Sequence, residues 1–307
     1  MIRFLQRFAF WTGLGALLLG CGASRLSPLE EGHALAGRVW DVSAEREISL
    51  EALFERASAS RFVILGEVHD NLEHHGLQAR ILTAMLQAGR LPALAMEQFD
   101  REHQAALDAA RRRGERDPER IADAGRFDHK GWNWPAYRPL VELAIANDLP
   151  IIAANMSREE ARAVARAGGP AGGLGPATPE LRAALERDLV EGHCGKRPAP
   201  AALAGMIEAQ RARDARMAAA LEGSGERGAV LIAGAGHARR DRGAPTYLSG
   251  SARGQLLAVA LVEIEPGRNE LGAYAGEGLA SSYDLVQFTP RAAREDPCKN
   301  FPEGPSR

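Results

Sequence analysis

Short apolar runs alternate with amphipathic segments along most of this chain. Four of the runs occupy residues 62–65, 93–96, 150–154 and 228–233, and each is too short for a helix of a globular protein. Between the runs, apolar residues recur at helical spacing, which gives each of these segments one apolar face. Buried strands that alternate with amphipathic helices predict the α/β class, with a mostly parallel central sheet and helices on both of its faces.

The flanking segments extend the same pattern into one α/β domain over residues 37–290. Residues 37–42 predict a first strand, and Ser49 is a suitable cap for the helix that follows it. Residues 255–263 and 284–288 predict two closing strands. Residues 291–307 are left as a C-terminal tail.

Residues 156–225 differ from the rest because they contain no convincing strand. A Gly- and Pro-rich loop ends at Thr178-Pro179, which is a helix-start signal, and a second helical pattern begins near Pro200. Met206 and Met217 in the second pattern are interpreted as core packing, since methionine commonly fills gaps in cores. This segment predicts a helical subdomain inserted over the carboxyl edge of the strands.

Each of the four apolar runs ends in a polar group. These groups are Glu67 with His69, then Glu97, Asn155 and His237. Because ligands of open α/β sheets bind at the carboxyl ends of the strands, four such groups together indicate a functional site. Any one of them alone is equally well explained as a helix cap, a hydrogen-bonded turn or a satisfied histidine.

The junction after the first of these runs has the greatest density of ionisable side chains. Asp70 is a suitable N-cap for a helix that begins near Asn71. Four titratable groups would then lie around one strand-to-helix turn, whereas His75 is expected to face solvent. The four groups are Glu67, His69, Glu73 and His74.

Two further segments contribute weaker candidates. Residues 127–138 contain two of the four tryptophans and one of the four tyrosines in a stretch without periodicity. They could form an aromatic wall for a flat ligand, which makes His129 and Tyr137 candidates, or anchor a long loop. His193, beside Cys194 in a Gly-flanked break between helices, could also face a ligand.

Composition and charge narrow the classes of function. The chain has 307 residues, of which 45% are hydrophobic, so it can bury a sizeable core. Its formal net charge is -2, its arginines are scattered over predicted helix faces, and no aromatic residues are interleaved with them to stack bases. We therefore exclude nucleic acid as a partner.

The first twenty residues have the pattern of a targeting segment. Arg3 and Arg7 precede an apolar run over residues 8–19, which is short for a membrane span, and Leu18-Leu-Gly-Cys21 follows. This resembles a bacterial lipoprotein signal peptide, which implies cleavage before Cys21 and its acylation, including palmitate. An ordinary secretory signal or a short anchor is the alternative.

A lipid anchor at Cys21 would attach the chain to the membrane through a tether over residues 21–36. Gly22 after the acylated cysteine implies the outer membrane, with the domain facing the periplasm. In that oxidising compartment Cys194 and Cys298 could pair as a disulfide, and a nucleophile or ligand role for Cys194 is the lesser alternative.

Several motifs, in this order, resemble the ChaN family of bacterial haem-binding, iron-regulated lipoproteins in the Tiki superfamily. They are Leu65-Gly-Glu-Val-His-Asp-Asn71, Met96-Glu-Gln-Phe99, Trp132 with Tyr137 and Pro139, Ala154-Asn155, Ala209-Gln210 with Asp214, and Gly234-Ala-Gly-His237. The resemblance implies an α/β core with a helical subdomain and haem in a cleft or across a homodimer. It also implies a role in iron uptake, with an outer-membrane haem or iron receptor as a partner.

Haem iron requires an axial donor, and its propionates require cations or N–H donors. Arg239 and Arg240 could pair with the propionates, and a tyrosine ligand, which we associate with this family, could be Tyr137 or Tyr247. No Cys-x-x-Cys-His is present, so haem would be bound non-covalently. The candidate cofactor-binding residues are His69, His74, Glu97, Tyr137, Asn155, His193 and His237.

The competing hypothesis is a hydrolase, protease or esterase-like, such as more distant members of the superfamily. Glu67, His69, Glu97 and His237 could bind a divalent metal such as zinc or manganese. Alternatively, Glu67, His69 and His237 could act directly, with a histidine as general base and the glutamate orienting it. The spacing of Glu67 and His69 is not that of a zincin, and no Gly-x-Ser-x-Gly elbow is present.

Overall fold

The computed structural model describes residues 32–271, 274, 279, 282–296 and 298–299. The predicted signal peptide, Cys21 and most of the predicted tether lie outside these residues. Among the helices of the described part, none combines the length and the apolar character needed to cross a membrane.

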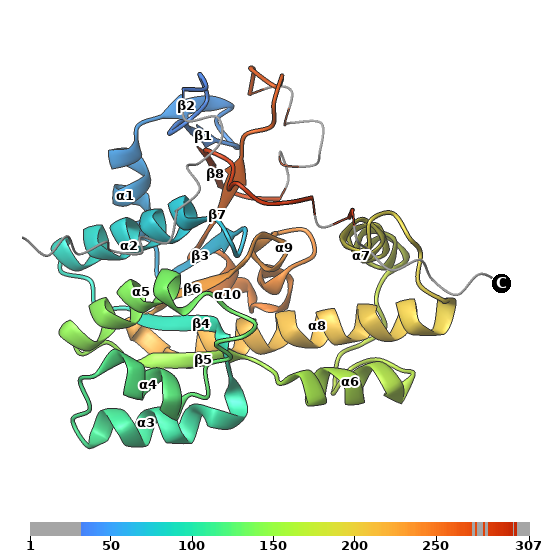
Figure 1. The fold of residues 1–307 in the computed structure, drawn as a ribbon, viewed down its shortest axis with the longest axis horizontal. Coiled ribbons are helices and arrows are strands. Elements are labelled where there is room, and N and C mark those ends of the chain that lie inside the picture. The colour runs from blue at the N-terminus through green and yellow to red at the C-terminus, as the bar shows by residue number, and fades with distance from the viewer. Residues whose placement is uncertain (1–31, 272–273, 275–278, 280–281, 297, 300–307) are drawn as a thin grey trace, which may run out of the picture.

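One eight-stranded sheet forms the centre of the molecule, in the order β2-β1-β8-β7-β3-β6-β4-β5 (Figure 1). Strands β3 to β8 pair in parallel, and β1 and β2 add an antiparallel edge beside β8. The strands are β1 (Val39–Asp41), β2 (Arg46–Ile48), β3 (Phe62–Glu67), β4 (Ala93–Asp100), β5 (Ile151–Asn155), β6 (Ala229–Gly234), β7 (Leu256–Glu263) and β8 (Leu285–Thr289). The prediction of a mostly parallel sheet is confirmed.

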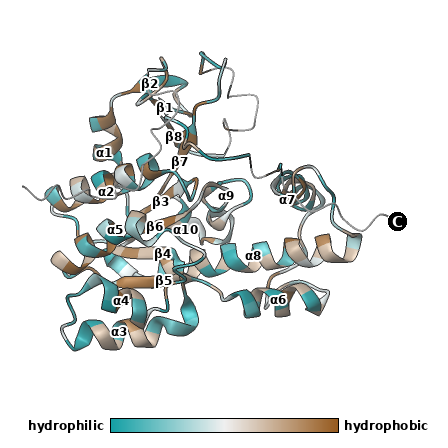
Figure 2. Cartoon of the chain, in the orientation of Figure 1, coloured by the Kyte–Doolittle hydropathy of each residue, from teal (hydrophilic) through white to brown (hydrophobic). Residues whose placement is uncertain are grey.

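Both faces of the sheet are covered, which explains why its strands have continuous apolar runs. In β3, Val63 and Leu65 belong to one core cluster, whereas Phe62 and Ile64 belong to a second cluster on the other face. The first cluster is completed by α1 (Leu50–Ala59), α2 (Leu72–Gln87), α3 (Gln104–Arg112), α4 (Pro118–Ala124) and α5 (Trp134–Ala146). The second is completed by α8 (Pro200–Gly223), α9 (Ala235–Ala238), η3 (Ala244–Tyr247) and α10 (Gly250–Arg253). In Figure 2 the apolar residues gather in the central strands, and the outer helix α6 is largely hydrophilic.

Residues 156–225 form the predicted helical insertion, with α6 (Arg158–Ala167), α7 (Pro179–Gly192) and α8. Thr178 caps α7 as expected, and Ser157 forms a capping box with Glu160 at the start of α6. Helices α6 and α8 cross closely at Gly205, where a Cβ atom would lie 2.3 Å from the carbonyl oxygen of Ala165. Helix α8 also packs on β5 and β6, so it connects the insertion to the sheet (Figure 1).

Three local expectations were wrong. The N-cap of α2 is Asn71 rather than Asp70, since the Asn71 side chain accepts the backbone N–H groups of Glu73 and His74. Strand β4 continues through Glu97 to Asp100, with an irregular register beyond Met96. The aromatic run over 127–138 is only partly a loop, because α5 begins at Trp134.

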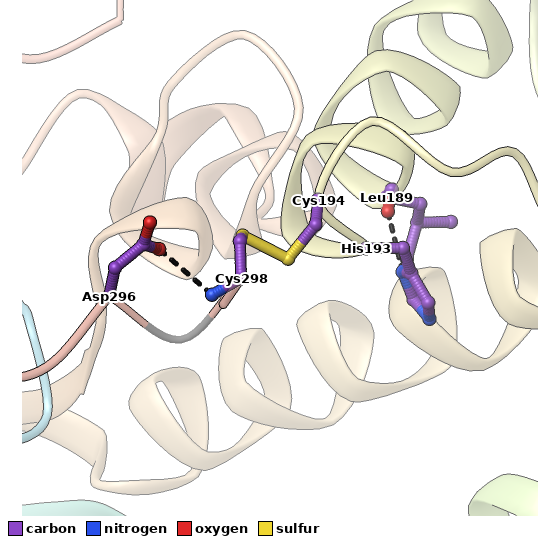
Figure 3. Close-up of a disulfide and its surroundings, with 5 residues drawn as sticks. All are labelled: Leu189, His193, Cys194, Asp296 and Cys298. Atoms are coloured by element: carbon purple, nitrogen blue, oxygen red, sulfur yellow. Dashed lines mark hydrogen bonds between the residues drawn. A yellow bond between two sulfur atoms is a disulfide. The ribbon is translucent and has the colours of Figure 1, made fainter. Parts of the chain in front are cut away.

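A disulfide joins the insertion to the C-terminal segment (Figure 3). Cys194, just after α7, is bonded to Cys298, with their Cα atoms 5.5 Å apart. The predicted pairing is confirmed, and it removes Cys194 as a nucleophile or a ligand. The same C-terminal segment contacts the core through Arg294, which pairs with Asp70 and Glu263.

Candidate functional site

The polar ends of β3, β4 and β6 meet at the carboxyl edge of the sheet. Glu67 of β3 lies in register with Gly234 of β6, and Glu97 of β4 accepts the Gly234 backbone N–H at 2.8 Å. Because α9 begins directly after β6, it brings His237 to the same place, with Nε2 3.4 Å from Oε1 of Glu97. The sequence prediction that Glu67, His69, Glu97 and His237 share one edge therefore agrees with the geometry.

Glu67 is the centre of the first half of the site, and it is only 2% exposed. Its Oε1 accepts the Tyr137 hydroxyl at 2.5 Å and the Nδ1–H of His69 at 2.9 Å. Its Oε2 accepts Nε2 of Gln78 at 2.6 Å and lies 3.3 Å from Nδ1 of His75. Burial favours the neutral acid, but the hydrogen bonds and charges of His69 and His75 outweigh it and hold the pKa of Glu67 well below its usual range. Glu67 is a stable buried carboxylate.

His69 is the part of this half that reaches the surface. Its side chain is 44% exposed, and its ring meets Trp132 edge-on at a centroid distance of 4.8 Å. Burial lowers the pKa of His69, but the hydrogen bond to Glu67 and the charge of Glu97 raise it by more. Glu67 bonds Nδ1 of this ring, and no residue in the described part of the chain forms a hydrogen bond with its Nε2.

Gly234 lets the backbone of the sheet edge approach this ring closely. A Cβ atom built on Gly234 would lie 3.0 Å from Nε2 of His69 and 3.7 Å from Oε2 of Glu97. Because Gly234 has no side chain, the imidazole of one half of the site can lie close to the carboxylate of the other.

The second half of the site is a histidine between two buried carboxylates. Nδ1 of His237 lies 2.6 Å from Oδ1 of Asp214 in α8, and Nε2 faces Glu97. Burial lowers the pKa of His237, but Glu97 and Asp214 together raise it to about 10. The same arrangement lowers the pKa of Glu97 to about 2 against the effect of burial. His237 is therefore a buried imidazolium at neutral pH.

Asn155 supports Glu97 instead of facing a ligand. Its Nδ2 donates to the Glu97 carbonyl at 2.9 Å, and its Oδ1 accepts from Arg213 at 2.7 Å. The side chain is buried, so the expectation that Asn155 contacts a cofactor directly is wrong in this structure. It instead ties β5 to β4 at the irregular part of β4.

Two adjacent histidines have the opposite roles to those expected. His74 is fully buried: Nδ1 accepts the Val68 backbone N–H at 2.9 Å, and Nε2 bonds the hydroxyl of Thr289 at 2.7 Å. Burial lowers the pKa of His74 to about 4, so it is a neutral structural residue with neither nitrogen free for a cofactor. His75, expected to face solvent, is only 3% exposed and supports Glu67.

Tyr137 does not line a ligand-facing aromatic wall, which was one of the two expectations for it. It is fully buried, and burial together with the charge of Glu67 raises the pKa of its hydroxyl above the usual range. Its phenolate is therefore not formed at neutral pH, and its hydroxyl is committed to Glu67.

The remaining candidates lie outside this cluster. His193 ends α7 beside the disulfide, and its Nδ1 donates to the Leu189 carbonyl at 2.6 Å (Figure 3). Arg239 and Arg240, expected to pair with propionates, instead pair with Asp241 and Asp284. Glu73 and His129 have exposed side chains away from the Glu67 hydrogen bonds.

The metal hypothesis finds no support in this arrangement. Within the described ranges, no group of three or more His, Cys, Asp or Glu side chains is disposed to hold a metal ion. Both carboxylate oxygens of Glu67 and Oε2 of Glu97 already accept hydrogen bonds from protein groups.

The sequence pattern did not predict that Gln78, His75 and Asp214 belong to the site. A local signal existed for each. Gln210 and Asp214 are four residues apart on α8, and both contact His237; His75 and Gln78 are three apart on α2, and both contact Glu67. The spacing shows that each pair shares a helix face, but not which face points to the sheet.

The family model of haem-binding uptake proteins, Tiki superfamily, ChaN, matches residues 53–248, which is more than half of the chain. This chain belongs to the ChaN family. The match contains every strand of the site and the whole helical insertion, so the site described above lies within the family region.

Among solved structures, ChaN of Campylobacter jejuni, a protein that binds haem cofacially, aligns with a TM-score of 0.68 and 22% sequence identity, over 82% of this chain and 96% of that one. This likeness shows a shared fold. The erythromycin esterase EreC in its open conformation aligns at a TM-score of 0.47 with 11% identity, over 85% and 98% of the two chains. A succinoglycan biosynthesis protein aligns at 0.48 with 10% identity, over 84% and 95%. These two likenesses are weaker than that to ChaN, and no curated protein sequence matches this ChaN-family protein.

Proposed function

We propose that this ChaN-family protein binds haem non-covalently as an outer-membrane lipoprotein in iron acquisition. The observation that carries the proposal is His69, a half-exposed imidazole whose Nδ1 is bound to a buried carboxylate and whose Nε2 has no hydrogen-bond partner among the described residues. Histidines that bind metals almost always donate the other ring N–H in this way.

The residues present fit a haem group at this edge. His69 supplies a nitrogen donor, Trp132 supplies an aromatic edge beside it, and the absence of a side chain at Gly234 avoids crowding of Nε2. Haem, if bound, would supply an iron centre, and His69 would be the residue that donates to it. The role of the chain is to hold the imidazole in place and to keep its donor nitrogen free.

The proposal also includes the cellular location of the protein. The Leu18-Leu-Gly-Cys21 sequence supports acylation of Cys21 and attachment to the outer membrane, with the domain facing the periplasm. The disulfide between Cys194 and Cys298 suits an oxidising compartment. A homodimer and a haem or iron receptor in the outer membrane are the partners that this role would require.

Replacement of His69 tests the proposal. We expect the mature protein to give a saturable Soret change on titration with hemin, and His69→Ala to weaken the affinity because the donor nitrogen is lost. The exposed His129→Ala is the matched control and should bind as the unaltered protein does. A protein that gives no saturable change, or an affinity that is the same in both variants, would contradict the proposal.

A metal-free hydrolase is the second candidate, and one observation favours it. His69 and the Glu97–His237 pair both lie next to Gly234, so a base and an imidazolium could act on the same bound group. In that case Glu67 would orient His69 as general base, and His237 would stabilise negative charge. The test is ester hydrolysis by hemin-free protein: turnover that His69→Ala and Gly234→Ala both abolish would support this candidate, and no turnover would remove it.

A further inference from the structure

A cleft of about 360 Å³ opens in the helical insertion, apart from the residues of the site described above. Helices α6 and α7 both pack on α8, and the loop that joins α6 to α7 forms part of the cleft wall (Figure 1). The volume lies within the range of roughly 300–1,000 Å³ that is usual for small-molecule sites. The walls are largely apolar, with Val164, Pro170, Pro176, Ala201 and Ala204 among them.

Glu208 of α8 lines this cleft although it is only 6% exposed. Its Oε2 accepts Nη1 of Arg211 at 2.7 Å and the Ala171 backbone N–H at 3.3 Å. Its Oε1 receives no hydrogen bond from any residue that the structure describes, and Nη2 of Arg182 lies 3.6 Å away. Because the oxygens of buried carboxylates are normally hydrogen-bonded, Oε1 favours a ligand that brings a donor or a positive charge.

Arg182 brings the opposite charge to the same cleft. Its side chain is 44% exposed, and its separation from Glu208 is longer than a hydrogen bond, so the guanidinium keeps N–H donors for a ligand. The helix ends at the cleft have matching polarity. Gly168 and Gly169, at the electronegative end of α6, line the cleft, and Arg182 lies near the electropositive start of α7. The cleft therefore presents a negative and a positive group side by side.

We propose that this cleft binds a free α-amino acid with an aliphatic side chain. The ammonium group donates to Oε1 of Glu208, the carboxylate accepts from Arg182, and the side chain lies against the apolar walls. One carbon atom joins the ammonium to the carboxylate in an α-amino acid, so the two groups suit protein partners as close as these. An amine or a carboxylate alone would satisfy only one of the two charges. The cleft shares no residue with the site proposed for haem.

Equilibrium dialysis of the hemin-free mature protein with radiolabelled leucine tests the proposal. We expect saturable binding of leucine. Isoamylamine, which lacks the carboxylate, and isocaproate, which lacks the ammonium, should each compete about 10-fold less well, because each loses a charge-assisted hydrogen bond. No saturable binding below about 1 mM, or competition by either analogue as strong as that by leucine, would overturn the proposal.

Replacement of Arg182 tests its role separately. Arg182→Gln should lower the affinity for leucine about 10-fold without weakening that for isoamylamine, because only the carboxylate of the ligand contacts this residue. Arg187→Gln is the matched control, since Arg187 is an exposed residue of α7 outside the cleft, and it should bind leucine as the unaltered protein does. Equal losses for leucine and isoamylamine in Arg182→Gln would contradict the proposed contact.

A larger side chain in the wall tests the location. Ala204 is an exposed residue of the cleft, so Ala204→Leu occupies the space of the ligand without entering the core, and it should abolish the binding of leucine. Ala202→Leu, also exposed on α8 but outside the cleft, should retain it. Unchanged binding in Ala204→Leu would show that leucine binds elsewhere and would overturn the assignment of the cleft.

Discussion

At the scale of single residues, burial and charge together determine which groups can do chemistry. Glu67, Glu97 and His237 are all buried, yet the pKa of each is shifted towards its ionised form, because histidine rings lie against Glu67 and because carboxylates lie against His237. His74 has no carboxylate in direct contact and hydrogen-bonds only neutral groups, so burial dominates and it stays neutral. Residues of the same type, five positions apart in His69 and His74, therefore have different functions.

His74 should make the protein sensitive to mild acid. Its pKa is lowered from 6.5 to about 4 in the folded state, so the unfolded chain binds the additional proton first as the pH falls. Its contribution is fully present above about pH 6.5, and about 3 kcal/mol of the free energy of unfolding is lost as the pH falls to about 4.

Urea unfolding at several pH values measures this effect. His74→Gln should lose stability at neutral pH but show a flatter dependence between those two pH values than the unaltered protein. The exposed His129→Gln reports the effect of the substitution itself. Parallel pH curves for the unaltered protein and His74→Gln would contradict the assignment.

At the scale of elements, helix α8 links the insertion to the sheet. It places Asp214 and Gln210 against His237, it packs on β5 and β6, and it crosses α6 at Gly205. A displacement of this helix would therefore change the second half of the site directly.

The crossing of α6 and α8 should not tolerate a methyl group. Gly205→Ala places Cβ 2.3 Å from the backbone oxygen of Ala165, so the helices must separate, and we expect a loss of about 1–3 kcal/mol in the free energy of unfolding. Gly223→Ala in the same helix meets no atom within 4 Å and should be neutral or slightly stabilising. Chemical denaturation of both variants measures the difference, and equal stabilities would show that the crossing is not tightly packed.

At the scale of the whole molecule, the disulfide joins the helical insertion to the C-terminal segment. Cys194 and Cys298 are separated by 104 residues, and the enclosed chain includes α8, β6, β7 and β8. The C-terminal segment between β8 and Cys298 also pairs with Asp70 next to His69, through Arg294. The tail, the insertion and the first half of the site are thus linked.

Removal of this bond should destabilise the whole fold. The chain-entropy model predicts a contribution of about 4–5 kcal/mol for a loop of this length. The double variant Cys194→Ser with Cys298→Ser should unfold at lower denaturant concentration than the oxidised protein and be insensitive to reductant. An unchanged midpoint would mean that native contacts, such as those of Arg294, hold the tail without the bond.

The sequence by itself determined the elements and the edge on which the site lies. Hydrophobic periodicity is local information, and it predicted the strands of the parallel core, the helical insertion and the caps at Ser49 and Thr178. The polar residues after the apolar runs 62–65, 93–96 and 228–233 were enough to place Glu67, Glu97 and His237 together, because carboxyl ends of parallel strands share one edge.

Only the tertiary structure decided which side chains face one another. His75 faces Glu67 and His74 faces Thr289, since neighbours on a helix point about 100° apart. Tyr137 and Asp214 join the site from α5 and α8, far along the chain from Glu67 and His237. Such contacts depend on how helices pack across the sheet, and no local pattern in the sequence contains that information.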